Sequence, residues 1–322
     1  MTISALTWTE FFGGIFLLFL GGELLVRGAV AFAKKLGVSP LLIGATFVAF
    51  GTSAPELVVS IGAAARGVVD IAIGNVLGSN LANLLLILGV TAALRPIVVG
   101  PKVVRRDSIT LLVSTAAVTG LAFADIIPRY AGAIMILLLV CHVGYGYWKE
   151  RREATLKASD INDYLENRSS DINTKPLWVS SCFLIIGITG VIFGAHFLVE
   201  SGTTMARAVG ISEAVIGLTV VALGTSLPEL ATSVISAIKR HGDVALGNIL
   251  GSSLFNLLGI LGAVVLVHPA PIPDVIANLD IWVLLGITCL VLIPVLIGWR
   301  LGRVAGGILL FLYVLYIVHH FI

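Results

Sequence analysis

A long internal repeat constrains the fold of this chain more than any other feature of the sequence. Residues 51–83 align without gaps to residues 224–256, and 17 of the 33 positions are identical. The same offset along the sequence relates Gly21 to Gly194 and Pro96 to Pro269. The chain therefore consists of two homologous halves, each of which is one structural unit.

The repeated segments lie among apolar runs of about 20 residues, which are long enough to cross a bilayer as helices. Only 12% of the 322 residues are charged and the mean hydropathy is +1.06, which excludes a water-soluble domain of this size. The first apolar run begins near Trp8 without a basic segment or a cleavage site before it, so we expect no cleaved signal peptide. The sequence therefore predicts an all-α integral membrane protein.

Hydropathy and turn signals predict ten transmembrane helices, five in each half. Their ranges are 8–33, 39–65, 71–94, 107–124, 129–148, 177–206, 212–238, 243–267, 278–298 and 304–320. Because five is an odd number, the second half enters the membrane from the opposite side, which predicts two inverted repeats. We divide the chain into a first repeat (1–148), a cytoplasmic linker (149–175) and a second repeat (176–322).

The basic residues predict the orientation of these helices. Three arginines, Arg66, Arg129 and Arg207, fall on one side, and Arg27 lies within the first span. The other side receives Lys34, Lys35, Arg95, Lys102, Arg105, Arg106, Lys149, Arg151, Arg152, Lys157, Arg168, Lys175, Lys239, Arg240, Arg300 and Arg303. Because positive residues accumulate on the cytoplasmic side, we expect both termini to lie outside the cytoplasm.

Each half carries a glutamate inside an apolar run, directly after a proline. Pro55 has no N–H to donate, so the carbonyl of Gly51 loses its helical partner. Thr52 and Ser53 lie on the same helical face as Glu56, which places hydroxyl, carbonyl and carboxylate oxygens together. The equivalent residues of the second half are Thr225, Ser226 and Glu229, behind Pro228.

A polar stripe follows on the next helix of each half, at positions i, i+4 and i+8. Its residues are Asn75, Ser79 and Asn83 in the first half and Asn248, Ser252 and Asn256 in the second. If the halves meet about a pseudo-twofold axis, an all-oxygen cluster forms near the middle of the membrane. Such a cluster suits Ca²⁺ or Na⁺ and not Zn²⁺ or Cu, and two carboxylates balance the charge of one Ca²⁺.

A simpler interpretation is that Glu56 and Glu229 only form hydrogen bonds between packed helices. Their recurrence at equivalent positions, each behind Thr-Ser-x-Pro, favours the ion site. Glu23 and Arg27 form a second charged pair in the first span, and Glu200 occupies the repeat position of Arg27. We interpret this group as a structural ion pair near the headgroups, with a gating pair as the alternative.

The paired "GTSxPE" and "GNxxGSxxxN" segments resemble the two α-repeats of the cation/Ca²⁺ exchanger superfamily, in particular its prokaryotic Na⁺/Ca²⁺ exchanger-like members. The similarity covers essentially the whole chain. The resemblance implies ten helices in two inverted halves, with the second, third, seventh and eighth helices around the ion sites. It also implies that the first and sixth helices slide across this core, and that the protein lies in a prokaryotic inner or plasma membrane.

By motif position, Glu56 and Glu229 would be the central ligands for Ca²⁺, shared with Na⁺. The resemblance implies further oxygen ligands from Thr52, Ser53, Thr225 and Ser226, from Ser79, Asn83 and Ser252 in flanking Na⁺ sites, and from the carbonyls of Ala49 and Ala222. Several family members place an aspartate where this sequence has Asn256, symmetric with Asn83. This departure leaves two carboxylates, so co-transport of K⁺ is not expected.

The sequence therefore predicts a secondary antiporter, and not an enzyme, that exchanges Ca²⁺ for Na⁺ by alternating access. A Ca²⁺/H⁺ antiporter and a cation channel are the alternatives. We expect no cofactor beyond the transported ions and no nucleic acid as a partner. No phosphate-binding loop is present, so a nucleotide is not expected either. The lipid bilayer is the expected surrounding, and the sequence predicts no oligomeric state.

Overall fold

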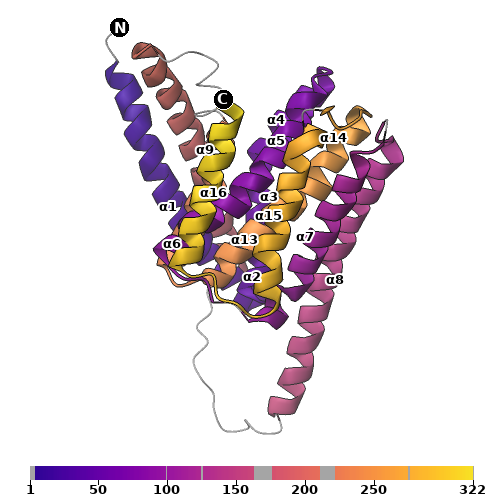
Figure 1. Ribbon diagram of the computed structural model, residues 1–322. Coiled ribbons are helices and arrows are strands. Elements are labelled where there is room, and N and C mark those ends of the chain that lie inside the picture. The colour runs from indigo at the N-terminus through magenta and orange to yellow at the C-terminus, as the bar shows by residue number, and fades with distance from the viewer. Residues whose placement is uncertain are drawn as a thin grey trace.

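The computed structural model describes residues 4–98, 100–124, 126–162, 176–210, 222–274 and 276–321. These residues form helices joined by short turns (Figure 1). The helices and π-helical turns of the first half are α1 (Ala5–Leu36), α2 (Pro40–Ile43), η1 (Gly44–Val48), α3 (Ala49–Thr52), α4 (Ala54–Ala65), α5 (Val69–Leu81), η2 (Ala82–Ile87), α6 (Leu88–Leu94), α7 (Pro101–Leu121) and α8 (Arg129–Asn162). Those of the second half are α9 (Leu177–Ala208), α11 (Ala222–Thr225), α12 (Leu227–Ile238), α13 (Gly242–Leu254), η4 (Phe255–Ile260), α14 (Leu261–Val267), η5 (Ile276–Asp280), α15 (Ile281–Leu296) and α16 (Arg303–Phe321).

Six of the described helices are long and apolar enough to cross a membrane, and a seventh span is formed if the bent pair 40–52 and 54–65 is counted. This confirms the prediction of an all-helical membrane protein. The other predicted spans do not meet this criterion of helix length and hydropathy in the described residues. α7 carries Arg105, Arg106 and Asp107 near its start, α16 offers only a shorter apolar stretch, and residues 211–221 of the span around α12 lie outside the described chain.

One boundary differs clearly from the sequence prediction. α8 continues to Asn162, past the predicted end of its span at residue 148, so the first part of the predicted linker is helical. Residues 163–175 of that linker lie outside the described residues. Hydropathy marks the apolar part of a helix, and it gives no signal where the same helix continues into water as a polar segment.

The central helices of the two halves begin at equivalent positions of the sequence repeat. α4 begins at Ala54 and α12 at Leu227, and α5 and α13 begin at Val69 and Gly242, so both pairs show the offset of the repeat. The π-helical turns η2 and η4, and the short helices α6 and α14 that follow them, keep the same separation. The repeat therefore determines local backbone structure, including the unusual π-helical turns.

α1 and α9 form an antiparallel pair of long helices beside the core (Figure 1). Gly14 of α1 lies against the backbone of Gly194, and Gly28 lies against that of Leu184. Midway between them, a Cβ atom added to Gly21 would lie 2.7 Å from the backbone nitrogen of Val191. Small residues at such contacts let membrane helices approach closely.

The most deeply buried spans are the two central ones, 69–94 and 242–267. Around them, outer helices are joined by buried polar contacts. Asp107 of α7 accepts from Arg106 Nε at 2.7 Å and lies 2.9 Å from His142 Nε2 of α8. At the repeat-equivalent position, Asp280 accepts a hydrogen bond from Tyr316 of α16 at 3.1 Å.

Candidate functional site

The site is built around two helix breaks that the repeat places at equivalent positions. α3 ends at Thr52 and α4 begins at Ala54, and the backbone of Ser53 between them has φ −84° and ψ 8°. Ser226 separates α11 from α12 with nearly the same geometry, φ −90° and ψ 2°. Pro55 and Pro228 each lie in the first turn of the following helix, where a missing N–H breaks no hydrogen bond. The predicted interruption at the prolines is confirmed.

Glu56 and Glu229 lie in the first turns of α4 and α12, and both side chains are 1% exposed. Each carboxylate is held by a hydroxyl of the opposite repeat. Ser53 Oγ donates to Glu229 Oε1 at 2.7 Å, and Ser226 Oγ donates to Glu56 Oε1 at 3.4 Å. The start of a helix favours negative charge, so each carboxylate is also stabilised by the helix that carries it.

The second oxygen of each carboxylate is buried and has no hydrogen-bond partner in the described part of the chain. No described lysine, arginine or histidine forms a salt bridge with Glu56 or Glu229, and the contacts of Ser53 and Ser226 hold the two carboxylates in one site. Ionised carboxylates inside a membrane need a compensating charge. A cation between them would supply it and would use both free oxygens.

The carboxylate-bearing helices are braced by two asparagines that the sequence analysis placed only in a polar stripe. Asn248 Nδ2 donates to Ser233 Oγ at 3.1 Å and to the carbonyl of Glu229 at 3.4 Å. Its Oδ1 accepts from Thr52 of the opposite repeat at 3.2 Å.

Asn75 makes the equivalent contacts in the first half, to Ser60 Oγ at 2.9 Å and to the carbonyl of Glu56 at 3.3 Å. Ser60 and Ser233 are absent from the predicted site. They follow the glutamates by four positions in both halves, and this recurrence was the available signal.

Several other predicted ligands also reach the carboxylates. Thr225 lies next to Glu56, and the hydroxyls of Thr52 and Ser252 lie next to Glu229. The residues that the structure brings together here come from α3, α4, α5, α11, α12 and α13 and from the helix breaks at Ser53 and Ser226.

Ser79, Asn83 and Asn256 are buried on the neighbouring segments α5, η2 and η4. Within the described residues, no hydrogen bond joins any of the three to either carboxylate. Both polar atoms of the Asn256 side chain are unpaired there, as is Asn83 Oδ1. Their packing next to α4 and α12 keeps them near the site without direct contact.

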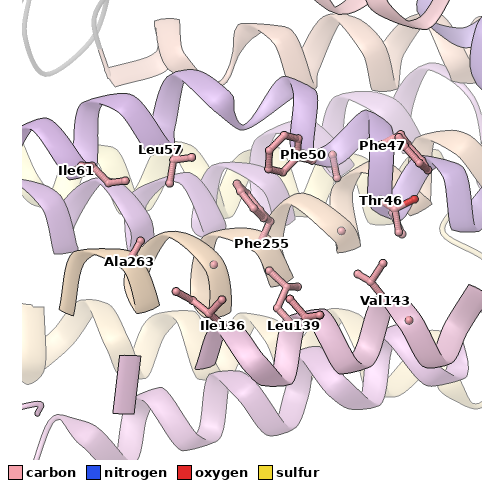
Figure 2. Close-up of a pocket in the computed structure, with 16 residues that line it drawn as sticks. Thr46, Phe47, Phe50, Leu57, Ile61, Ile136, Leu139, Val143, Phe255 and Ala263 are labelled. Atoms are coloured by element: carbon pink, nitrogen blue, oxygen red, sulfur yellow. The ribbon is translucent and has the colours of Figure 1, made fainter. Parts of the chain in front are cut away.

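Cavities border the site in the described part of the chain, and two of them extend along α4. One of about 730 Å³ lies between η1, α3 and α4 on one side and α8 and η4 on the other, and its lining is almost wholly apolar (Figure 2). Phe50 and Phe255 meet across it with ring centroids 5.1 Å apart. Because it contains no carboxylate, this cavity does not suit a cation. A second cavity, of about 510 Å³, lies between α4 and α9 and reaches Thr225.

Comparisons with known proteins show the family to which the chain is similar. A family described as sodium/calcium exchanger protein matches residues 6–148 and 179–322. A candidate antiporter of Alkalimonas amylolytica, CaxA, is 37% identical over 312 residues, which cover 94% of this chain and 95% of the relative. The sodium/calcium exchanger MaX1 of Methanosarcina acetivorans is 33% identical over 345 residues, with 95% of each chain covered.

A solved structure shows the same similarity in three dimensions. The sodium-calcium exchanger NCX_Mj, soaked with zero Na⁺ and Ca²⁺, superimposes with a TM-score of 0.84 over 98% of each chain, at 30% sequence identity. This agreement covers essentially the whole of both chains. The fold, and not only the repeated motifs, is therefore shared.

Proposed function

The chain belongs to the sodium/calcium exchanger protein family, and from this premise we propose that it is a secondary antiporter that exchanges Ca²⁺ for Na⁺ by alternating access. The observation that carries the proposal is the pair of repeat-related carboxylates of Glu56 and Glu229. They are buried, face each other's repeat, and each leaves one oxygen unpaired within the described residues. Members of this family are transporters, so no covalent step is assigned to these residues.

The donor set fits the proposed ions. Ca²⁺ takes 6–8 oxygen ligands at 2.3–2.6 Å, and two carboxylates with the hydroxyls of Ser53, Ser226 and Thr225 approach that number. One Ca²⁺ neutralises two carboxylates, and Na⁺ ions entering the same oxygen cluster neutralise them equally well. Because Ca²⁺ and Na⁺ compete for the same two carboxylates, binding of one ion displaces the other. The nearby side chains of Ser79, Asn83 and Ser252 are assigned to flanking Na⁺ sites. Thr52 and Asn256 are assigned to the same oxygen cluster.

The architecture proposed for this exchange is two inverted repeats of five transmembrane helices, residues 1–148 and 176–322, joined by a cytoplasmic linker at 149–175. Two observations support it. Helix boundaries recur with the offset of the sequence repeat, and α1 runs antiparallel to α9, its counterpart in the second half. With the orientation expected from the basic residues, both termini lie outside, in a prokaryotic inner or plasma membrane.

Exchange for protons is the second candidate, because two buried carboxylates without a cationic partner among the described residues can also be neutralised by H⁺. One experiment separates the candidates. Purified protein in liposomes is assayed for ⁴⁵Ca²⁺ uptake under imposed Na⁺, H⁺ or K⁺ gradients. An outward Na⁺ gradient should drive uptake, whereas the pH and K⁺ gradients should not. Uptake driven by the pH gradient alone would assign Ca²⁺/H⁺ exchange, and uptake without any counter-ion would indicate a channel.

Charge-neutral variants test the assigned residues in the same assay. We expect Glu56→Gln and Glu229→Gln each to reduce Na⁺-driven ⁴⁵Ca²⁺ uptake by about 100-fold or more, because a neutral amide leaves the Ca²⁺ charge uncompensated in the membrane. Glu153→Gln, at an exposed position of α8, is the matched control and should transport normally. Wild-type rates in both site variants would refute the assignment.

A further inference from the structure

The two halves of the protein differ in how closely the α1–α9 pair covers them. α12 packs closely against α1, and its Thr232 is fully buried. The repeat counterpart of α12 is α4, where Val58 and Val59 remain 71% and 41% exposed. The cavity of about 510 Å³ separates this face of α4 from α9 and reaches Thr225 beside the carboxylates. The equivalent cavity between α1 and α12 is smaller, about 230 Å³, and its lining includes no hydroxyl of the site. The site is therefore covered more closely along α1 and α12, which we call the closed side, than along α9 and α4, the open side.

An ion pair between α1 and the end of α12 stabilises the closed side. Lys239, the residue that ends α12, places Nζ 2.7 Å from Glu23 Oε2 of α1 and 2.9 Å from its Oε1. Arg27, one turn further along α1, also contacts Glu23, at 2.5 Å. The Glu23 side chain is only 22% exposed as a result. The contact joins α1 to the end of the carboxylate-bearing helix. It favours a gating role for Glu23, the alternative in the sequence analysis, although with Lys239 as an additional partner that the sequence did not indicate.

The open side also carries two opposite charges, Arg66 and Glu200. Only Arg66 is the repeat equivalent of a member of the Lys239–Glu23 pair, because the position of Glu23 is occupied by His196. Arg66 ends α4 as Lys239 ends α12, at the equivalent position of the other half. Glu200 of α9 occupies the position of Arg27, and its one ion pair within the described residues is with His196, at 3.4 Å. The Glu200 side chain is 59% exposed, and Arg66 is exposed with no salt bridge in the described part of the chain.

In transporters built from inverted repeats, one half moves against the other around a fixed site, and the two halves exchange conformations between the two facing states. We propose that Arg66 and Glu200 form, in the opposite-facing state, the ion pair that Lys239 and Glu23 form here, so that the two pairs close alternately. This inference rests on the alternating access of the proposed function. In the expected orientation the Lys239 pair closes the cytoplasmic side and the Arg66 pair closes the outer side.

Ion pairs of this kind are weak enough for the closed side of the protein to open again. A solvent-accessible ion pair changes an equilibrium by roughly two- to fivefold. Each pair therefore biases the facing state without locking it. Removing the Lys239 pair should favour closure of α9 on α4, and repulsion between position 66 and Glu200 should reverse that shift.

Cysteine labelling measures the open side directly. Val58→Cys is introduced into a full-length chain whose Cys141, Cys182 and Cys289 are replaced by serine, and the rate of reaction with a membrane-impermeant maleimide is recorded. A Cys at Ile126, which is 59% exposed in the turn between α7 and α8 and is expected on the same outer side, gives the reference rate in a parallel chain and reports correct insertion.

The variants form a series with opposite expected effects. Lys239→Gln should slow labelling at position 58 by roughly two- to fivefold. Adding Arg66→Glu should restore the faster rate, and adding Glu200→Arg to that chain, which recreates an ion pair with reversed charges, should slow it again.

An unchanged rate in Lys239→Gln would overturn the proposal, and so would a slowed rate that Arg66→Glu does not restore. The labelling is done without Ca²⁺ or an ion gradient, so its outcome is independent of which ions are exchanged. Absence of ⁴⁵Ca²⁺ flux with the full labelling pattern would reject the proposed function and leave the alternating ion pairs in place.

Discussion

Single residues already distinguish the two halves of the site, although the repeat makes their sequences alike. Glu229 has the shorter hydrogen bond from the opposite serine, 2.7 Å against 3.4 Å for Glu56. Asn248, which braces Glu229, is fully buried, whereas Asn75 beside Glu56 is partly exposed. The environment of Glu56 is therefore the looser one in this conformation, on the side where the cavity between α4 and α9 is open.

This difference predicts unequal effects of removing the two asparagines. Asn248→Ala removes the hydrogen bonds to Thr52, Ser233 and the carbonyl of Glu229 in a buried environment, which should destabilise the protein by about 1–3 kcal/mol. Asn75→Ala should cost less, because Asn75 is itself partly exposed and its hydrogen bonds reach only residues of its own half. Thermal unfolding of both variants in detergent measures the difference. A larger loss for Asn75→Ala would contradict this account of the bracing.

Asn256 offers a second test at this scale, because both polar atoms of its buried side chain are unpaired within the described residues. Asn256→Asp adds an ionisable group close to the carboxylate pair, so ⁴⁵Ca²⁺ uptake should become more dependent on pH than in the wild type. Asn256→Ser, which adds no ionisable group, is the control. If the aspartate variant keeps the wild-type pH profile, Asn256 lies too far from the transported ions to act on them.

The helices show which parts of the fold can be read from sequence. Pro55 and Pro228 predicted the two helix breaks, because a missing N–H has a local consequence. The π-helical turns η2 and η4 were not predicted, because an apolar run with one asparagine is compatible with both α- and π-helical hydrogen bonding. Ser60 and Ser233 were missed for a related reason. A serine on a membrane helix usually indicates close packing, and only the partner asparagine shows its role.

The glycine contacts between α1 and α9 predict a large effect from a very small change. Gly21→Ala would place a Cβ atom 2.7 Å from the backbone of Val191, so the helices must separate, at a cost of about 1–3 kcal/mol. Gly13→Ala is the matched control on the same helix, because its Cβ atom would meet nothing within 4 Å. It should be neutral or slightly stabilising. Equal unfolding temperatures for the two variants would show that α1 and α9 do not pack this closely.

For the whole molecule, the repeat predicted what hydropathy alone does not, namely that two distant glutamates converge. The cross-repeat contacts of Ser53 and Ser226 show this convergence. The unequal covering of α4 and α12 was not predictable, because equivalent sequences cannot specify which half is open in a given state. That asymmetry is a property of the conformation.

The central claim is that Glu56 and Glu229 together bind one Ca²⁺ in competition with Na⁺. Calorimetric titration of the purified protein with Ca²⁺, at increasing Na⁺ concentrations, tests it most directly. The account predicts one Ca²⁺ per chain, an affinity that falls as Na⁺ rises, and loss of binding in both Glu56→Gln and Glu229→Gln. Ca²⁺ binding that persists in either variant, or that is indifferent to Na⁺, would contradict it.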